Sequence, residues 1–177
     1  LDAWVEKIGE DKAEEIRQDA LAFGTGTHAA AEDILHNKAP SFLDHDHFLA
    51  ARSLIGKIID SINLGEILGI EKSVFSDKID VAGTIDLVAY AENLSKPELT
   101  VFDFKTTKRD PQIRDDHLLQ CSAYAKLFEE SSGIPVKKIG IVQVSRNNFN
   151  TIITIKNPAY YYEIFLERLE YYKKVKK

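Results

Sequence analysis

Two apolar runs joined by a short polar link constrain this chain more than any other feature. Residues 81–91 and 99–106 are rich in Val, Ile, Leu and Phe, and neither run keeps its apolar side chains to alternate positions. Apolar side chains on both faces are typical of strands buried inside a sheet. The polar residues 92–97 favour a turn. We therefore expect two neighbouring strands near the centre of a sheet.

Charged side chains interrupt both runs. Asp86 lies in the first run, and Asp103 and Lys105 lie in the second. Residues two apart on a strand point to the same face, so Asp103 and Lys105 share one face, and Phe102 and Phe104 share the other. An exposed ion pair is the alternative, but a buried unpaired carboxylate is costly and needs a reason. We predict that Asp86 and Asp103 hold a divalent metal ion, with Lys105 facing the same water or phosphate.

The periodicity of the remaining chain predicts helices, then strands, with further helices interleaved. Helices are expected over 11–23, from Thr27 onward, over 45–63, over 111–130 and from Pro158 after an Asn157 cap, and strands over 71–76, 81–91, 99–106, 138–145 and 150–155. Residues 24–26 are expected to break the first helix, and Thr27 to cap the second. This order predicts one α/β domain over 1–177, with a helical part over 1–66 and a catalytic sheet with helices over 67–177.

Composition excludes several classes of protein. The chain has 177 residues, enough for one full core, and a net charge of −5 argues against coating nucleic acid by bulk charge. The longest apolar run is too short to cross a bilayer, so no membrane role is expected. One cysteine, Cys121, leaves no internal disulfide and no site built from several thiolates. It fits a reducing, intracellular location, and we expect it to be a small core side chain.

The order of the polar residues resembles the RecB-like branch of the PD-(D/E)XK nuclease superfamily. The matching segments are Gly-Thr-His over 26–28, Glu71, Gly-Thr-Ile-Asp over 83–86, Asp-Phe-Lys-Thr over 103–106, and Gln120 with Tyr124. Within that branch the chain is most similar to small exonucleases of the phage and mitochondrial genome-maintenance type. The resemblance is close over 24–125 and implies a restriction-endonuclease-like fold, with a mixed central sheet flanked by helices and an N-terminal helical segment.

The resemblance implies a role for each matching residue. Asp86 and Asp103 would bind Mg²⁺ or Mn²⁺ with the Phe104 carbonyl, and Glu71 and His28 would lie at or near the metal. Lys105 would orient and help deprotonate the attacking water. Gln120 would hold Lys105 or the strand backbone, and Tyr124 would contact phosphate or pack beside the site.

The implied activity is that of a metal-dependent DNA exonuclease acting on single strands or free ends, with replication or recombination proteins as further partners. Two alternatives stay open: a nuclease-fold module that binds nucleic acid without cutting it, and a structure-selective endonuclease. The presence of Asp86, Asp103 and Lys105 together weighs against the first. A single cysteine excludes the iron–sulfur cluster of some relatives, and no phosphate-binding loop is present for a fused helicase.

Other polar residues receive structural interpretations. His45 and His47 are expected near a helix start rather than at a metal site, and His117 is expected on the surface. The tyrosines at 160–162 and 171–172 could stack on bases, but packing of the last helix is the commoner reason for such residues. We predict that the helices over 1–63 form one wall of the substrate channel.

Overall fold

The computed structural model describes residues 2–39, 44–92 and 96–176, with side chains from residue 5 onward. The elements are α1 (Asp2–Ile8), α2 (Glu10–Leu35), α3 (His45–Ile62), β1 (Leu64–Ser76), β2 (Val81–Ala91), β3 (Glu98–Thr107), α4 (Asp115–Ser132), β4 (Lys138–Ser145), β5 (Thr151–Lys156) and α5 (Pro158–Val175). The centre of the polar link expected over 92–97 lies outside these residues. No described helix combines the length and apolar character needed to cross a membrane.

The five strands form one mixed sheet in the order β1-β2-β3-β4-β5. Strands β3 and β4 are parallel, and the other neighbouring pairs are antiparallel. A parallel pair needs a crossover connection, which α4 supplies. The predicted α/β class and the mixed sheet are therefore confirmed.

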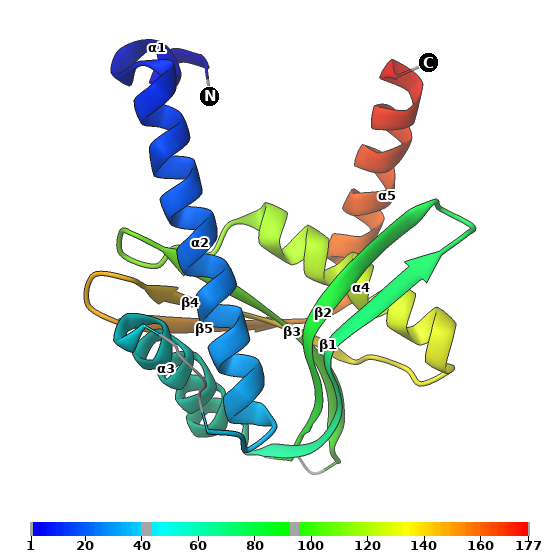
Figure 1. The fold of residues 1–177 in the computed structure, drawn as a ribbon. Coiled ribbons are helices and arrows are strands. Elements are labelled where there is room, and N and C mark those ends of the chain that lie inside the picture. Colours follow the sequence, from blue (N-terminus) through cyan, green and yellow to red (C-terminus); the bar gives the residue numbers. More distant parts are fainter. Residues whose placement is uncertain (1, 40–43, 93–95, 177) are drawn as a thin grey trace.

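Helices cover both faces of this sheet (Figure 1). Helices α2 and α3 pack on one face, and α4, backed by α5, packs on the other. Phe102 and Phe104 enter the core under α2 and α3, whereas Val101 enters the core under α4. The expected alternation along β3 is confirmed, and it places Asp103 on the α4 side of the sheet.

The expected break between the first two helices is wrong. Helix α2 runs without interruption through residues 24–26, and Thr27 is buried within it, where its hydroxyl donates to the Phe23 carbonyl at 2.8 Å. Gly26 instead permits close packing, because a Cβ at this position would overlap the ring of His47 on α3. Tertiary packing thus explains a glycine that local propensity assigns to a helix end.

Other boundaries also differ from expectation. Strand β1 begins at Leu64, not at residue 71, and its irregular register near Ile67 obscures the alternation in the sequence. Helix α4 begins at Asp115, not at 111, because the preceding loop is held by a hydrogen bond from the Gln112 N–H to Oε1 of Gln143 at 2.8 Å. The Asn157 cap of α5 is confirmed, since its Oδ1 accepts from the Ala159 N–H.

We expected helix packing to bury the five tyrosines of α5. This expectation is wrong for three of them. Tyr160 is 64% exposed, Tyr171 is 71% exposed and Tyr172 is 52% exposed. Tyr161 alone among the five packs against the α4 core. The last turns of α5 extend past the sheet, so they have little to pack against (Figure 1).

Candidate functional site

The central strands β2 and β3 separate at the site. Their pairing ends at Leu87 and Phe102, and β3 continues beside β4. One residue beyond the last pair, Oδ2 of Asp86 accepts a hydrogen bond from the Phe104 N–H. The Asp86 side chain thus accepts a β3 backbone hydrogen bond at a point where backbone pairing with β2 has ended. Asp86 and Asp103 both lie where the two strands diverge.

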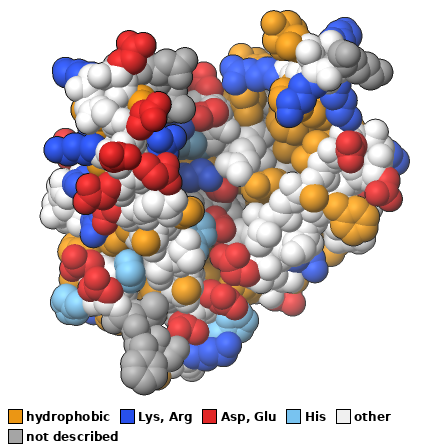
Figure 2. Space-filling view, turned by 45° about the horizontal axis from the view of Figure 1, so that its top comes forward, with side chains coloured by type: hydrophobic (Ala, Val, Ile, Leu, Met, Phe, Trp, Pro, Cys, Tyr) orange, Lys and Arg blue, Asp and Glu red, His pale blue; other side chains and the backbone are white. Residues whose placement is uncertain are grey.

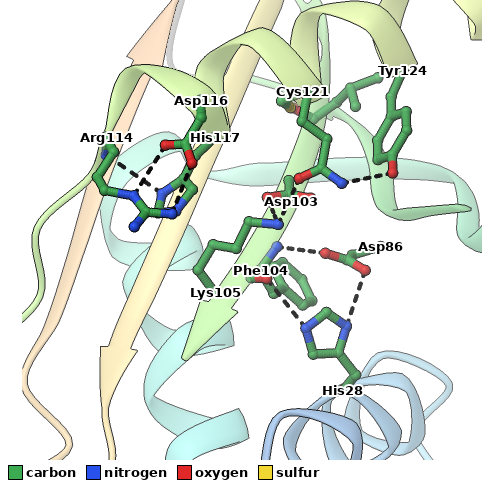
Figure 3. A network of polar contacts seen from close by, with 12 residues as sticks. His28, Asp86, Asp103, Phe104, Lys105, Arg114, Asp116, His117, Cys121 and Tyr124 are labelled. Atoms are coloured by element: carbon green, nitrogen blue, oxygen red, sulfur yellow. Dashed lines mark hydrogen bonds and ion pairs between the residues drawn. The ribbon is translucent and has the colours of Figure 1, made fainter. Parts of the chain in front are cut away.

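His28 reaches this fork from α2 (Figure 3). Its Nδ1 lies 3.1 Å from Oδ1 of Asp86 and 3.7 Å from Oε1 of Glu71, and its Nε2 donates to the Phe104 carbonyl at 3.2 Å. One ligand atom from each of His28, Glu71 and Asp86 lies within 4.8 Å of the others. A neutral imidazole carries one N–H, so Nδ1 then turns a lone pair toward two carboxylates. Either a proton or a metal cation resolves that repulsion.

Glu71 occupies an uncommon backbone conformation for a strand residue. Its φ is 46°, in the left-handed region, while Ile70 and Lys72 on either side keep their pairing with β2. A non-glycine residue held there costs about 1–3 kcal/mol, and such strain concentrates at functional sites. The strained residue here is one of the three that could bind a metal.

The side chain of Lys105 points its ammonium group toward Asp103 (Figure 3). Its Nζ is 2.8 Å from Oδ2 of Asp103 and donates to Oε1 of Gln120 at 2.9 Å, and Nε2 of Gln120 donates to the Tyr124 hydroxyl at 2.8 Å. The contact with Asp103 has the distance of an ion pair without the angles of a hydrogen bond. Oδ2 of Asp103 is therefore buried without a hydrogen-bond partner among the described residues. The Lys105 ammonium offsets the charge of this oxygen, and its lone pairs make it a suitable ligand for a cation.

Burial and mutual repulsion shift the pKa values of the acidic groups. Burial raises the pKa of Asp103 to about 6, with the Lys105 ammonium opposing this and the Asp86 carboxylate adding to it. Burial and the Asp86 charge also raise the pKa of Glu71. For His28, burial opposes protonation, but the hydrogen bond to Asp86 and the surrounding carboxylates outweigh it and raise the pKa. The site carries excess negative charge that a divalent cation would neutralise.

The structure brings the eight predicted residues together in two groups. His28, Glu71 and Asp86 form a potential ligand set, and Asp103, Lys105, Gln120 and Tyr124 form a chain of contacts beside it. Phe104 contributes only its backbone, since its side chain lies in the core under α2 and α3. Asp103 is not one of the three residues whose ligand atoms gather within 4.8 Å.

The histidine expected on the surface is buried. His117 is 9% exposed, and its Nδ1 faces the Arg114 N–H at the start of α4. Burial and the nearby Lys105 and Arg114 charges lower its pKa despite Asp116. His45 begins α3 behind an Asp44 cap, as expected. Cys121 is fully buried, as expected, and burial raises the pKa of its thiol, which excludes a reactive thiolate.

One residue at the site was missed in the sequence. Glu32 lines an open cleft of about 510 Å³ with His28 and Glu71, and its charge adds to the rise in the pKa of Glu71. Its position four residues after His28 places it on the same face of α2 and was the available signal. Gly83 lies against the ring of Tyr124, where a Cβ would overlap it. Figure 2 shows the hollow between the two sides of the molecule.

Two solved structures show distant likeness to this fold. A protein from Eubacterium rectale, described provisionally as an exonuclease, is 12% identical with a TM-score of 0.49, and the match covers 85% of this chain and 63% of that one. SSO0001 is 16% identical with a TM-score of 0.35, covering 66% of this chain and 54% of that one. The chain thus spans less than two thirds of the length of either. No family model and no curated protein matches it. Likeness at this level identifies no activity, so the function has to be argued from the site itself.

Proposed function

We propose that this chain is a metal-dependent nuclease of the RecB-like PD-(D/E)XK type, which hydrolyses phosphodiester bonds in DNA as an exonuclease. One observation carries the proposal: the fork between β2 and β3 gathers a histidine and two carboxylates within 4.8 Å of one another, next to the Asp103–Lys105 pair. Structural ion pairs do not require three ligand atoms converging on one point. A cation that neutralises phosphate charge and a basic side chain that positions the attacking water both assist phosphodiester hydrolysis.

The donor set fits a small divalent ion. Asp86 and Glu71 offer carboxylate oxygens and His28 offers Nδ1, while Oδ2 of Asp103 is a buried oxygen without a hydrogen bond. Hard oxygen donors favour Mg²⁺ or Mn²⁺ over softer metals. The bound ion would neutralise phosphate charge and make a water molecule more acidic.

Lys105 is placed to hold the attacking water or a phosphate oxygen. The Gln120 amide fixes its Nζ on the α4 side, and the Tyr124 hydroxyl fixes the amide in turn. Asp103 keeps a counter-charge 2.8 Å from the ammonium. These contacts restrict the motion of a flexible side chain, which is how a protein positions a reacting group before the reaction.

The surroundings favour a DNA strand that enters by its end. The cleft beside His28 and Glu71 is bounded by α2, in line with the predicted wall over 1–63. The space between α2 and the α4–α5 side is hollow (Figure 2). A free end or a single strand enters such a space more readily than a continuous duplex does. Intracellular proteins that generate DNA ends in replication or recombination are the partners that this activity would need.

The proposal is tested with linear and circular single-stranded DNA, in Mg²⁺, in Mn²⁺ and in chelator. We expect the wild type to degrade linear DNA only, and only with metal. Asp103→Asn and Lys105→Ala should remove the activity, whereas Asp77→Asn, which changes an exposed carboxylate in the turn between β1 and β2, should retain it.

Each other outcome rejects a defined part of the proposal. Cleavage of circles would identify an endonuclease. Binding without cleavage by the wild type would identify a non-catalytic module. Cleavage that Asp103→Asn and Lys105→Ala leave intact would place the activity outside this site.

A further inference from the structure

Helix α5 has two chemically different sides. Its exposed glutamates are spaced four and three residues apart, at Glu163, Glu167 and Glu170. A second set repeats every four residues, at Arg168, Tyr172 and the C-cap residue Lys176, and is called here the cationic stripe. On a helix that turns about 100° per residue, the centres of the two sets lie about half a turn apart. The three glutamates and the cationic stripe thus lie on opposite sides of α5, and Lys174, four residues after Glu170, lies on the glutamate side.

The cationic stripe begins near a cleft that adjoins the candidate active site. Phe165 lines a cleft of about 290 Å³ together with Gln120 and Tyr124, the residues that hold Lys105. Arg168 follows Phe165 by three residues, so the two side chains are neighbours on one face of the helix. The stripe therefore runs from this cleft along α5 toward its C-terminal end. Figure 2 shows Lys or Arg side chains mixed with hydrophobic ones on that side of the hollow.

Protein packing does not account for the stripe. Tyr172 is 52% exposed, and Nζ of Lys176 lies over its ring, 4.7 Å from the centroid. Within the described part of the chain, no carboxylate pairs with Arg168 or Lys176. Two cations without a carboxylate partner among the described residues and an exposed aromatic ring, in a chain of net charge −5, complement a polyanion with flat aromatic groups.

We propose that the cationic stripe binds a single-stranded nucleic acid on its path to or from the active site. Arg168 and Lys176 contact phosphates, and Tyr172 stacks on a base. Such alternation of aromatic and basic side chains is how proteins bind single strands without reading sequence, and a duplex keeps its base faces covered. The inference rests on the proposed nuclease function, and it specifies single-stranded nucleic acid as the substrate of that nuclease.

The test compares two matched double variants. Tyr172→Ala/Lys176→Ala removes a ring and a charge from the stripe, and Tyr171→Ala/Lys174→Ala removes the same groups from outside it. Binding of a fluorescent oligothymidylate is measured by anisotropy in chelator, over a range of salt concentrations. We expect the stripe variant to raise the Kd about tenfold and to reduce the salt slope by about 0.7, as loss of one stacked base and one phosphate contact implies. The other variant should change the Kd less than about twofold.

A second measurement separates this inference from the nuclease proposal. Hydrolysis of bis(4-nitrophenyl) phosphate in Mn²⁺ reports the metal site alone, because this small diester has a single phosphate and no flanking nucleotides to occupy the stripe. The stripe variant should retain that rate, and Lys105→Ala should lose it. If the wild type hydrolyses neither the diester nor linear DNA but the anisotropy difference stands, the inference that the stripe binds single strands survives and the nuclease proposal fails.

Three results would overturn the stripe inference. The first is equal weakening of binding by both double variants. The second is no weakening by either. The third is a change of molecular mass in the stripe variant alone, by light scattering and with DNA binding intact, which would mean that a second copy of the protein covers the stripe.

Discussion

The ring of Tyr124 lies directly on the backbone of Gly83. A Cβ on residue 83 would overlap Cε1, Cζ and the hydroxyl oxygen of this tyrosine. The same hydroxyl accepts the hydrogen bond from Gln120, which accepts in turn from Lys105. A glycine on β2 therefore determines, through a ring and an amide on α4, where the ammonium group of Lys105 lies.

Gly83→Ala should therefore reduce activity while the fold persists. The new methyl group displaces the Tyr124 ring, and Gln120 loses its partner. We expect kcat to fall on the order of tenfold and the free energy of unfolding to fall by about 1–3 kcal/mol. Steady-state kinetics and urea unfolding measure the two effects.

A double-mutant cycle provides the control. If the methyl group acts through the ring, Gly83→Ala should cost much less stability in a Tyr124→Ala background than alone. Tyr124→Phe, which keeps the ring and removes the hydroxyl, should reproduce the loss of kcat without the loss of stability. Additive effects of the two alanine substitutions would contradict this mechanism.

The His28 nitrogen predicts a preference between metals. Imidazole is a softer ligand than carboxylate, and Mn²⁺ accepts it more readily than Mg²⁺ does. We expect wild-type activity at saturating metal to be higher in Mn²⁺ than in Mg²⁺. His28→Ala should reduce that ratio as well as the activity itself. Metal titrations that followed initial rates would measure it, and an unchanged ratio in His28→Ala would place this side chain outside the metal shell.

Gly24 and Gly26 offer a matched test of helix packing. Both lie inside α2, where alanine is favoured over glycine by about 1 kcal/mol. A Cβ at Gly24 would meet only Oγ1 of Thr106, at an ordinary 3.5 Å, whereas one at Gly26 would overlap the His47 ring. Gly24→Ala should therefore raise the free energy of unfolding, and Gly26→Ala should be less stable than Gly24→Ala by about 1–3 kcal/mol. Urea unfolding of both variants would decide this, and equal stabilities would reject packing as the reason for Gly26.

The local pattern of apolar residues predicted the two central strands and the alternation of their side chains between the two faces of the sheet. Apolar content on both faces of 81–91 and 99–106 is a property of the strands themselves, so it could be read without knowledge of their partners. The placement of Asp103 and Lys105 on one face followed from the same period of two. The class of fold could be predicted because it depends mainly on such local signals.

The features that failed depend on contacts between distant segments. Gly26 was interpreted as a helix break because its partner, His47, lies on another helix. The burial of His117 depends on where α4 meets the sheet, and the exposure of Tyr172 depends on where α5, packed on α4, passes beyond the sheet. At the site, each candidate residue could be identified from the sequence by itself. The hydrogen bond from the Phe104 N–H to Asp86 could not be predicted, because it depends on where β2 and β3 separate. A strand pattern shows no sign of the point at which pairing stops.

The shifted pKa values predict how pH affects the metal-free protein. The pKa of Asp103 is raised from 3.8 to about 6 in the folded state, so between these values the folded state binds more protons than the unfolded state. Stability must then fall as pH rises through this range. The raised pKa of Glu71 acts in the same direction, and the raised pKa of His28 extends the loss above its ordinary 6.5. For Asp103 the effect is at most about 3 kcal/mol, given roughly 1.4 kcal/mol per pKa unit.

In chelator, we therefore expect the Tm to decrease from pH 5 to pH 8. Asp103→Asn should flatten this decrease and raise the Tm at pH 8, because it removes a buried charge. Mn²⁺ should stabilise the wild type more as pH rises, since metal binding requires deprotonated ligands. Asp77→Asn, an exposed carboxylate outside the site, should keep the wild-type profile. A Tm in chelator that rose over this range, or parallel profiles for Asp103→Asn and the wild type, would mean that the buried carboxylate does not control the stability of the site.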